Sequence, residues 1–248
     1  MNVHKRLFVF LASSALLCGL AAGNGAAHAD VDASAKQALG IDVSNHNGPV
    51  DFKAVKKDGR DFAFVLATDG SSFRSELFDR QYRGASKAGL FRGAYHFARP
   101  DSSASKQANH FLKTVNYRND GKSLPPVLDM EANPANPNGS TCYGLNHKQM
   151  KAWIKDFLGK VKKTTKRDAI IYTSPVFWQE CTGNSKAFKD NPLWIAQWGV
   201  GKPDKIGGWP DYTFWQYSES GHVDGVKRKV DVNRFNGGVA KLGKLAQG

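Results

Sequence analysis

The segment Val127-Leu128-Asp129-Met130-Glu131 places two acidic residues, Asp129 and Glu131, two positions apart at the end of an apolar run. In a β-strand, residues two apart face the same side, roughly 6.5 Å apart at a rise of about 3.3 Å per residue. Burial and a neighbouring carboxylate raise the pKa of one member of such a pair, which leaves a protonated acid beside an anion. Glycosidic bond hydrolysis uses that pair of groups. The alternative is that both are ordinary strand-end carboxylates that make caps or surface contacts.

Two further acids lie in apolar runs near the two ends of the chain. Asp42 belongs to the run Gly40–Ser44, and Asp231 belongs to the run Val230–Phe235. If these runs are the first and last strands of a closed barrel, they are neighbours. All four carboxylates then converge on one mouth of the barrel, and charged groups are seldom buried without a partner or a role.

Aromatic side chains occur at the ends of the same kind of run: Tyr95, Tyr172, Trp198 and Trp215. Aromatic faces suit the apolar faces of sugar rings, and the tyrosine hydroxyl and indole N–H donate hydrogen bonds. Packing in the core or at the rim is the alternative for each of them. His96, beside Tyr95, has two interpretations: a general acid or base, or a structural histidine hydrogen-bonded near the mouth.

The elements that must position these residues recur regularly. Eight strand-like runs are Gly40–Ser44, Phe62–Ala67, Phe91–Phe97, Pro126–Met130, Ala169–Thr173, Leu193–Trp198, Tyr212–Tyr217 and Val230–Phe235. Segments with helical spacing separate the first five, and His147–Val161 is the clearest amphipathic pattern. After the sixth run the connections are rich in Gly, Pro and Asp, which predicts loops.

This alternation predicts an α/β fold with parallel strands, because a parallel crossover needs a return of helical length. Eight runs indicate an eight-stranded barrel whose last strands are joined by short loops. A doubly wound open sheet is the rival. Neither a GxGxxG after the first run nor a GxxxxGK[ST] is present, so nucleotide-binding versions of that sheet lose support.

The N-terminus has the pattern of a secretory signal. Lys5 and Arg6 precede the apolar stretch Leu7–Ala22, and Ala27-His28-Ala29 offers a cleavage site before Asp30. We therefore expect a signal peptide over residues 1–29 and a single secreted domain over residues 30–248. An uncleaved anchor is the alternative.

Composition and cysteine usage agree with one secreted domain. The chain has 248 residues, 41% of them hydrophobic, and a formal net charge of +13, which becomes +11 once Lys5 and Arg6 are lost with the signal. A basic secreted protein is attracted to anionic surfaces such as cell walls, whereas no interleaving of aromatic and basic residues indicates nucleic acid. Cys142 and Cys181 form an even pair in an oxidising compartment, which predicts a disulfide rather than two free thiols. No cysteine or histidine cluster suggests a metal.

Several segments together resemble the lysozymes of glycoside hydrolase family 25, the Chalaropsis-type N-acetylmuramidases. They are Gly-Ile-Asp-Val-Ser at 40–44, Gly-Ala-Tyr-His-Phe-Ala-Arg-Pro at 93–100, Leu-Asp-Met-Glu at 128–131, Leu-Trp-Ile-Ala at 193–196, Phe-Trp-Gln-Tyr-Ser at 214–218 and Asp-Val-Asn-Arg-Phe at 231–235. They occur in the family's order and span Gly40 to Asn236.

The resemblance implies a modified TIM-like barrel of five β/α units followed by three strands. It implies hydrolysis of the β-1,4 bond from N-acetylmuramic acid to N-acetylglucosamine in peptidoglycan, without a metal or other cofactor. By carry-over, Glu131 is the general acid and Asp129 stabilises an oxazolinium formed by the substrate's acetamido group, which retains the anomeric configuration. Asp42 and Asp231 are supporting acids. The four aromatic residues named above line the subsites.

The sequence also departs from the family pattern. The second run ends in Leu66-Ala67-Thr68-Asp69-Gly70, where the family usually has Lys-Ala-Thr-Glu-Gly. Gln197-Trp198 differs from the usual aromatic-tyrosine ending. A non-catalytic wall-binding barrel and a glycosidase for chitin-like polymers are the competing functions, and we expect a monomer that no longer contacts the membrane after signal cleavage.

Overall fold

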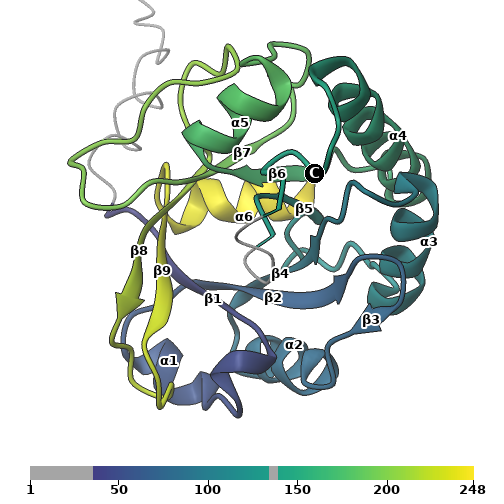
Figure 1. Cartoon of the computed structure of the whole chain (residues 1–248). Coiled ribbons are helices and arrows are strands. Elements are labelled where there is room, and N and C mark those ends of the chain that lie inside the picture. The colour runs from purple at the N-terminus through teal and green to yellow at the C-terminus, as the bar shows by residue number, and fades with distance from the viewer. Residues whose placement is uncertain (1–35, 134–138) are drawn as a thin grey trace, which may run out of the picture.

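The computed structural model describes residues 36–133 and 139–248, so the expected signal peptide lies outside the described residues. A single sheet forms the centre of the molecule (Figure 1). Its strands are β1 (Leu39–Val43), β2 (Phe62–Asp69), β3 (Phe73–Arg74), β4 (Phe91–Phe97), β5 (Val127–Met130), β6 (Ile170–Thr173), β7 (Leu193–Ala196), β8 (Phe214–Gly221) and β9 (Val230–Phe235). Their order is β1-β9-β8-β7-β6-β5-β4-β2-β3, and β1 also pairs with β2. This pairing closes an eight-stranded barrel and leaves β3 as an additional edge strand.

The strand directions explain the end of the chain. Neighbouring strands from β1 through β2 and β4 to β8 are parallel, whereas β9 runs antiparallel to both β8 and β1. The β8–β9 connection is too short for a crossover helix, so the chain turns back directly. The general expectation of parallel strands is therefore wrong for β9. The expected barrel of five β/α units followed by three strands is confirmed.

Helices follow each of the first five barrel strands. They are α1 (Phe52–Lys57), α2 (Phe78–Lys87), α3 (Ala104–Val115), α4 (His147–Thr165) and α5 (Pro175–Thr182), with a short 3-10 helix, η1 (Asn45–Asn47), before α1. No helix within the described ranges is both long and apolar enough to cross a lipid bilayer.

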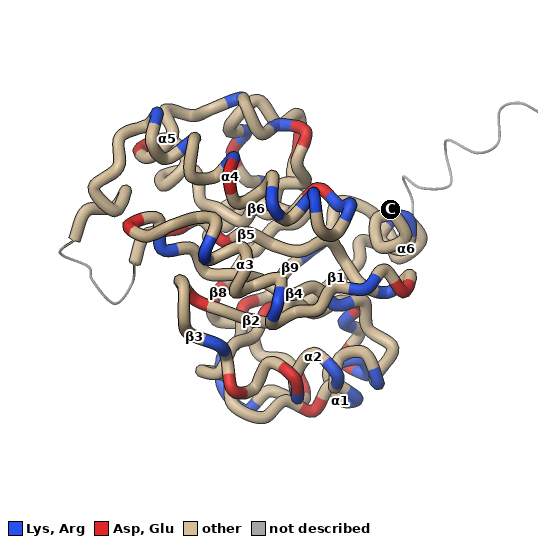
Figure 2. The backbone as a smooth tube through the Cα atoms, turned by 90° about the vertical axis from the view of Figure 1, so that its right-hand side faces the viewer, with Lys and Arg blue, Asp and Glu red and all other residues tan. Residues whose placement is uncertain are grey.

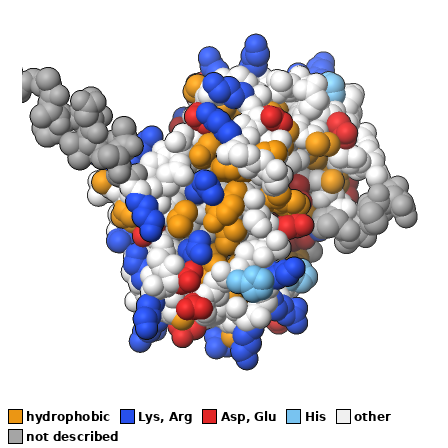
Figure 3. Space-filling view, turned by 90° about the vertical axis from the view of Figure 1, so that its left-hand side faces the viewer, with side chains coloured by type: hydrophobic (Ala, Val, Ile, Leu, Met, Phe, Trp, Pro, Cys, Tyr) orange, Lys and Arg blue, Asp and Glu red, His pale blue; other side chains and the backbone are white. Residues whose placement is uncertain are grey.

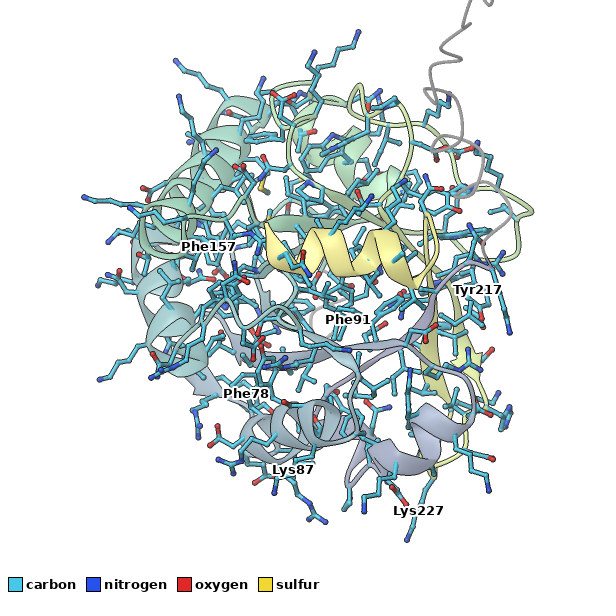
Figure 4. All side chains as sticks on the ribbon, turned by 180° about the vertical axis from the view of Figure 1, so that it is seen from behind. Phe78, Lys87, Phe91, Phe157, Tyr217 and Lys227 are labelled. Carbon is cyan, nitrogen blue, oxygen red and sulfur yellow. A yellow bond between two sulfur atoms is a disulfide. The ribbon has the colours of Figure 1, made fainter. Side chains whose placement is uncertain are left out.

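The structure also contains a helix that the sequence patterns did not predict, α6 (Val239–Gln247). Seen from behind, α6 lies across the end of the barrel, next to Phe91 (Figure 4). Leu242 and Ala246 are buried there in the same apolar cluster as Phe91. The helix thus covers the floor of the barrel, at the end opposite the carboxyl ends of the parallel strands.

Alternating residues of the strands fill the barrel interior. Phe64 stacks on Trp194 with ring centroids 4.3 Å apart, and Phe62 and Phe214 pack beside them. These rings occupy the space that a side chain at Gly93 would need, because a Cβ there would lie 2.4 Å from Phe64. The lower barrel is therefore solid, and inward-facing residues nearer the carboxyl ends of the strands form the site.

Candidate active site

A cleft of about 370 Å³ opens at the carboxyl ends of the parallel strands. Asp42, Asp129, Glu131 and Asp231 all line it, so the structure brings the four predicted carboxylates together. Figure 2 shows acidic positions near β5 and β8, toward the same end of the barrel. Asp129 and Glu131 share one face of the strand as their spacing predicts.

Asp129 and Glu131 form a close carboxyl pair. Asp129 is buried and lies between Phe97 of β4 and Tyr172 of β6 in the strand register. Burial, and next the charge of Glu131, raise the pKa of Asp129 well above its usual value. Burial also raises the pKa of Glu131 to about 7, with a further increase from Asp42. Since two such groups cannot both ionise cheaply, the pair holds a proton near neutral pH.

Asp42 and Asp231 form a second pair because β9 runs antiparallel to β1, which places them opposite each other in the register. Asp42 accepts hydrogen bonds from Asn233 Nδ2 at 2.7 Å and Gln216 Nε2 at 3.0 Å. Burial raises the pKa of Asp42 despite these donors. Burial, followed by the charge of Asp42, raises the pKa of Asp231 to about 9. This second pair therefore also keeps a proton at neutral pH.

Aromatic donors orient the two amides that hold Asp42. Tyr172 Oη and Trp198 Nε1 donate to Gln216 Oε1 at 3.0 Å and 3.2 Å. Trp194 Nε1 donates to Asn233 Oδ1 at 2.8 Å. With their oxygens occupied, both amides must turn their N–H₂ groups toward Asp42. Sequence reasoning assigned no role to Gln216 or Asn233, although Asn233 stands two residues after Asp231 and so faces the same side.

Three of the four predicted aromatic residues border the cleft: Tyr95, Tyr172 and Trp198. Trp215 does not, and the prediction for it needs correction. Its indole is buried, donates from Nε1 to the Gln197 carbonyl at 2.8 Å and packs under the Arg234 guanidinium. Trp215 alternates with the inward-facing Phe214 and Gln216, so its side chain lies outside the barrel wall.

His96 is a structural residue. It is fully buried, hydrogen-bonded through Nδ1 to Thr68 at 2.7 Å and through Nε2 to Gln107 at 2.9 Å. Burial lowers the pKa of His96 to about 4, so it stays neutral. Because His96 points away from the cleft, between the sheet and α3, the general acid or base interpretation has no geometric support.

A network outside the strand pairing fixes the segment that carries Glu131. The single Tyr143 hydroxyl proton is shared between the carbonyl of Glu131, at 3.1 Å from Oη, and that of Ala98, at 3.3 Å. Tyr143 has a positive φ of 56° and follows Cys142 directly. The predicted disulfide between Cys142 and Cys181 is confirmed, and it joins this loop to α5. The bridge thus anchors the residue that holds the backbone of Glu131.

Asp69, where the second run departs from the family pattern, forms an ion pair in the structure. Asp69 accepts two hydrogen bonds from Arg99, at 2.6 Å and 2.7 Å. The Arg99 guanidinium stacks over Phe97, and its charge partly offsets the rise that burial causes in the pKa of Glu131. Leu66 lines the cleft nearby without a charge. The aspartate therefore retains an ion pair at the rim of the cleft.

A second hollow, of about 420 Å³, adjoins the cleft. Both spaces are lined by Glu131, Tyr172 and Trp198, and Val176 contributes an exposed apolar side chain to the second. Trp198 is itself 47% exposed. Glu131 therefore stands where two adjoining spaces meet.

A barrel with carboxyl groups gathered at the carboxyl ends of its strands is the arrangement typical of barrel glycoside hydrolases. The family model for "Glycosyl hydrolases family 25" matches residues 41–226. The chain belongs to this family and is a glycoside hydrolase.

Individual relatives agree with that assignment. "Lysozyme M1" of Streptomyces globisporus is 46% identical over 211 residues, covering 84% of this chain and 70% of the relative. The "N,O-diacetylmuramidase" of Arthroderma benhamiae is 40% identical over 222 residues, covering 89% and 91%. The solved bacterial lysozyme from Streptomyces coelicolor superposes with a TM-score of 0.82 at 43% identity, covering 86% of this chain and 98% of that structure.

Proposed function

We propose that the protein is a secreted N-acetylmuramidase, which cleaves the β-1,4 bond between N-acetylmuramic acid and N-acetylglucosamine in bacterial peptidoglycan. Its relatives carry the names lysozyme and N,O-diacetylmuramidase, which supports peptidoglycan as the substrate. The observation that carries the proposal is the position of Glu131. With a pKa raised to about 7, it lies between two adjoining spaces, as an acid that protonates a bond between two sugars must.

In this mechanism Glu131 transfers its proton to the glycosidic oxygen while the bond from that oxygen to the anomeric carbon breaks. The acetamido oxygen of the substrate attacks the anomeric carbon and forms an oxazolinium. The carboxyl pair shares one proton, and when that proton lies on Glu131 for transfer, the Asp129 carboxylate stabilises the positive charge. Water then attacks the anomeric carbon, and the Glu131 carboxylate accepts its proton, so the configuration is retained.

The remaining groups support these steps. Asp42 and its amide donors keep the Asp231 carboxyl close to the site, and the charge of Asp42 disfavours a second negative charge on the Asp129–Glu131 pair. Tyr95, Tyr172 and Trp198 provide aromatic surface and polar donors for the sugars. The scheme needs no metal ion, since carboxyl groups and the substrate's acetamido group accommodate every change of charge.

Product analysis tests the proposal. Residues 30–248 are incubated with peptidoglycan and, separately, with chitin oligomers, and the new reducing-end sugar is identified. We expect peptidoglycan to be cleared with muramic acid at the new reducing end, and chitin oligomers to remain intact. Preferential cleavage of chitin oligomers would identify a different glycosidase. Sedimentation with peptidoglycan without any new reducing end would identify a wall-binding barrel.

Secretion has its own test. The N-terminal sequence of the protein recovered from the culture medium should begin at Asp30, and a different first residue would refute the proposed cleavage site.

A further inference from the structure

The outer face of α4 concentrates positive charge. Residues 147–167 contain eight Lys and Arg residues against one acid, Asp156, whereas the whole chain has 35 against 22. In Figure 4 long side chains tipped with nitrogen project outward from the helix that carries Phe157. On the side of β8 and β9, by contrast, Figure 3 shows Lys and Arg interspersed with Asp and Glu. The positive charge of the molecule is therefore unevenly placed.

Four of these lysines share one helix face. Lys148, Lys151, Lys155 and Lys162 follow one another at intervals of three, four and seven residues. This spacing places their side chains in one row, which extends over about 21 Å at a rise of 1.5 Å per residue. A row of ammonium groups so close together is mutually repulsive unless anions lie between them.

Three members of the row have no counter-ion among the described residues. In the part of the chain that the structure describes, the ammonium groups of Lys148, Lys151 and Lys155 make no hydrogen bond or ion pair. Lys162 differs, because it pairs with Asp168 at 2.7 Å. The row therefore presents free positive charge rather than a satisfied network of salt bridges.

The row borders a surface trough. One hollow of about 510 Å³ lies between α4 and the segment around Phe188, and another of about 530 Å³ adjoins it. Ala152, Lys155 and Gly159 line both hollows, and a Cβ at Gly159 would meet nothing within 4 Å. Leu158 and Phe188, both largely buried, give the first hollow an apolar floor. We call this feature, with its lysine row, the α4 trough.

We propose that the α4 trough binds a phosphodiester-linked anionic polymer of the bacterial cell wall, and so holds the enzyme on its insoluble substrate. This inference rests on the proposed function for the nature of the surface. Lysine is a point charge that binds phosphate well. Lysines placed three and four residues apart match a polymer with a charge on every short repeat better than a glycan with one acidic group per disaccharide. The apolar floor suits the carbon atoms between successive phosphates.

The experiment uses residues 30–248 and two variants with equal loss of charge. Lys148→Gln/Lys151→Gln/Lys155→Gln neutralises the unpaired row. Lys53→Gln/Lys57→Gln/Lys87→Gln is the matched control, because these lysines are exposed on α1 and α2, away from α4 (Figure 1). Circular dichroism verifies that both variants fold. Binding to poly(glycerol phosphate) is measured over a series of salt concentrations, with polygalacturonate and phosphatidylglycerol vesicles as comparison ligands.

We expect the α4 variant to bind poly(glycerol phosphate) about tenfold more weakly or worse. The slope of the logarithm of its binding constant against the logarithm of the salt concentration should become shallower by about 2, because each of the three lost phosphate contacts contributes roughly 0.7. The control should stay within about twofold of the wild type on the same scale. Equal weakening in both variants would reduce the effect to net charge and overturn the proposal. Equal or tighter binding of polygalacturonate, or of the vesicles, through the same lysines would overturn the assigned partner.

Hydrolysis of short soluble glycan fragments separates this inference from the proposed function. Both variants should cleave them at the wild-type rate, while the α4 variant clears polymer-bearing walls more slowly than the wild type and polymer-free walls equally well. If no protein cleaves the fragments, the proposed function fails, yet the polymer titration still decides the role of the trough. If the α4 variant clears both kinds of wall like the wild type, the trough does not hold the enzyme on its substrate.

Discussion

The disulfide between Cys142 and Cys181 makes a quantitative prediction. The two cysteines are 39 residues apart in the sequence, and the enclosed segment contains α4 and β6. Restraining a loop of that length in the unfolded chain stabilises the folded state by about 4 kcal/mol. In a domain of this size each kcal/mol corresponds to about 2–4 °C in Tm. Loss of the bridge should therefore lower Tm by roughly 8–16 °C.

The assay compares thermal unfolding of the wild type with Cys142→Ala/Cys181→Ala, each with and without reductant. Alanine is chosen because Cys181 is fully buried, where a serine hydroxyl would lack a partner. Reductant should destabilise the wild type and leave the variant unchanged, which separates the bridge from the small cavity that the substitutions create. A wild type shown to be fully reduced, yet with a Tm within about 2 °C of the oxidised protein, would refute the loop-entropy reasoning.

Three further predictions concern the site. For Glu131, whose pKa is raised to about 7, kcat/KM should fall as pH rises through 7 and the acid loses its proton, and should fall again in acid, where the Asp129 carboxylate with its raised pKa becomes protonated; a profile flat across neutral pH in initial-rate assays would contradict this. Tyr143→Phe removes the hydroxyl that the Glu131 and Ala98 carbonyls share and should cost about 1–3 kcal/mol in thermal unfolding, with kcat lowered more than KM is raised; an unchanged kcat would show that Tyr143 does not position Glu131. Trp198→Ala should raise KM by about 5- to 30-fold with little change in Tm, because the side chain is 47% exposed; in steady-state kinetics Val239→Ala, also exposed but on α6, should leave KM unchanged, and an unchanged KM in Trp198→Ala would contradict the subsite role.

Strand periodicity accounts for much of what the sequence predicted. Asp129 and Glu131 could be placed on one face of a strand because alternation is a local property of the backbone. The same rule, applied to the seventh run, would have separated Trp215 from its inward neighbours Phe214 and Gln216. The aromatic type of Trp215 was given more weight than its parity, and this produced the incorrect prediction.

Other features depend on contacts between distant segments. The opposition of Asp42 and Asp231 requires β9 to run antiparallel, a consequence of the β8–β9 turn that no single strand pattern shows. The role of Gln216 depends on Tyr172 and Trp198, which lie 44 and 18 residues away in the sequence. Helix α6 packs Leu242 and Ala246 on the apolar floor of the barrel, a surface that strands far away in the sequence assemble.

The central claim is that Glu131 is the acid that protonates the leaving sugar. Its most direct test is Glu131→Gln, assayed for kcat on soluble glycan fragments and for sedimentation with peptidoglycan. The substitution preserves size and hydrogen bonding but removes the transferable proton, so kcat should fall by about 10²- to 10⁴-fold while fold and binding persist. A Glu131→Gln protein that folds, binds and still hydrolyses the fragments at close to the wild-type rate would contradict the account.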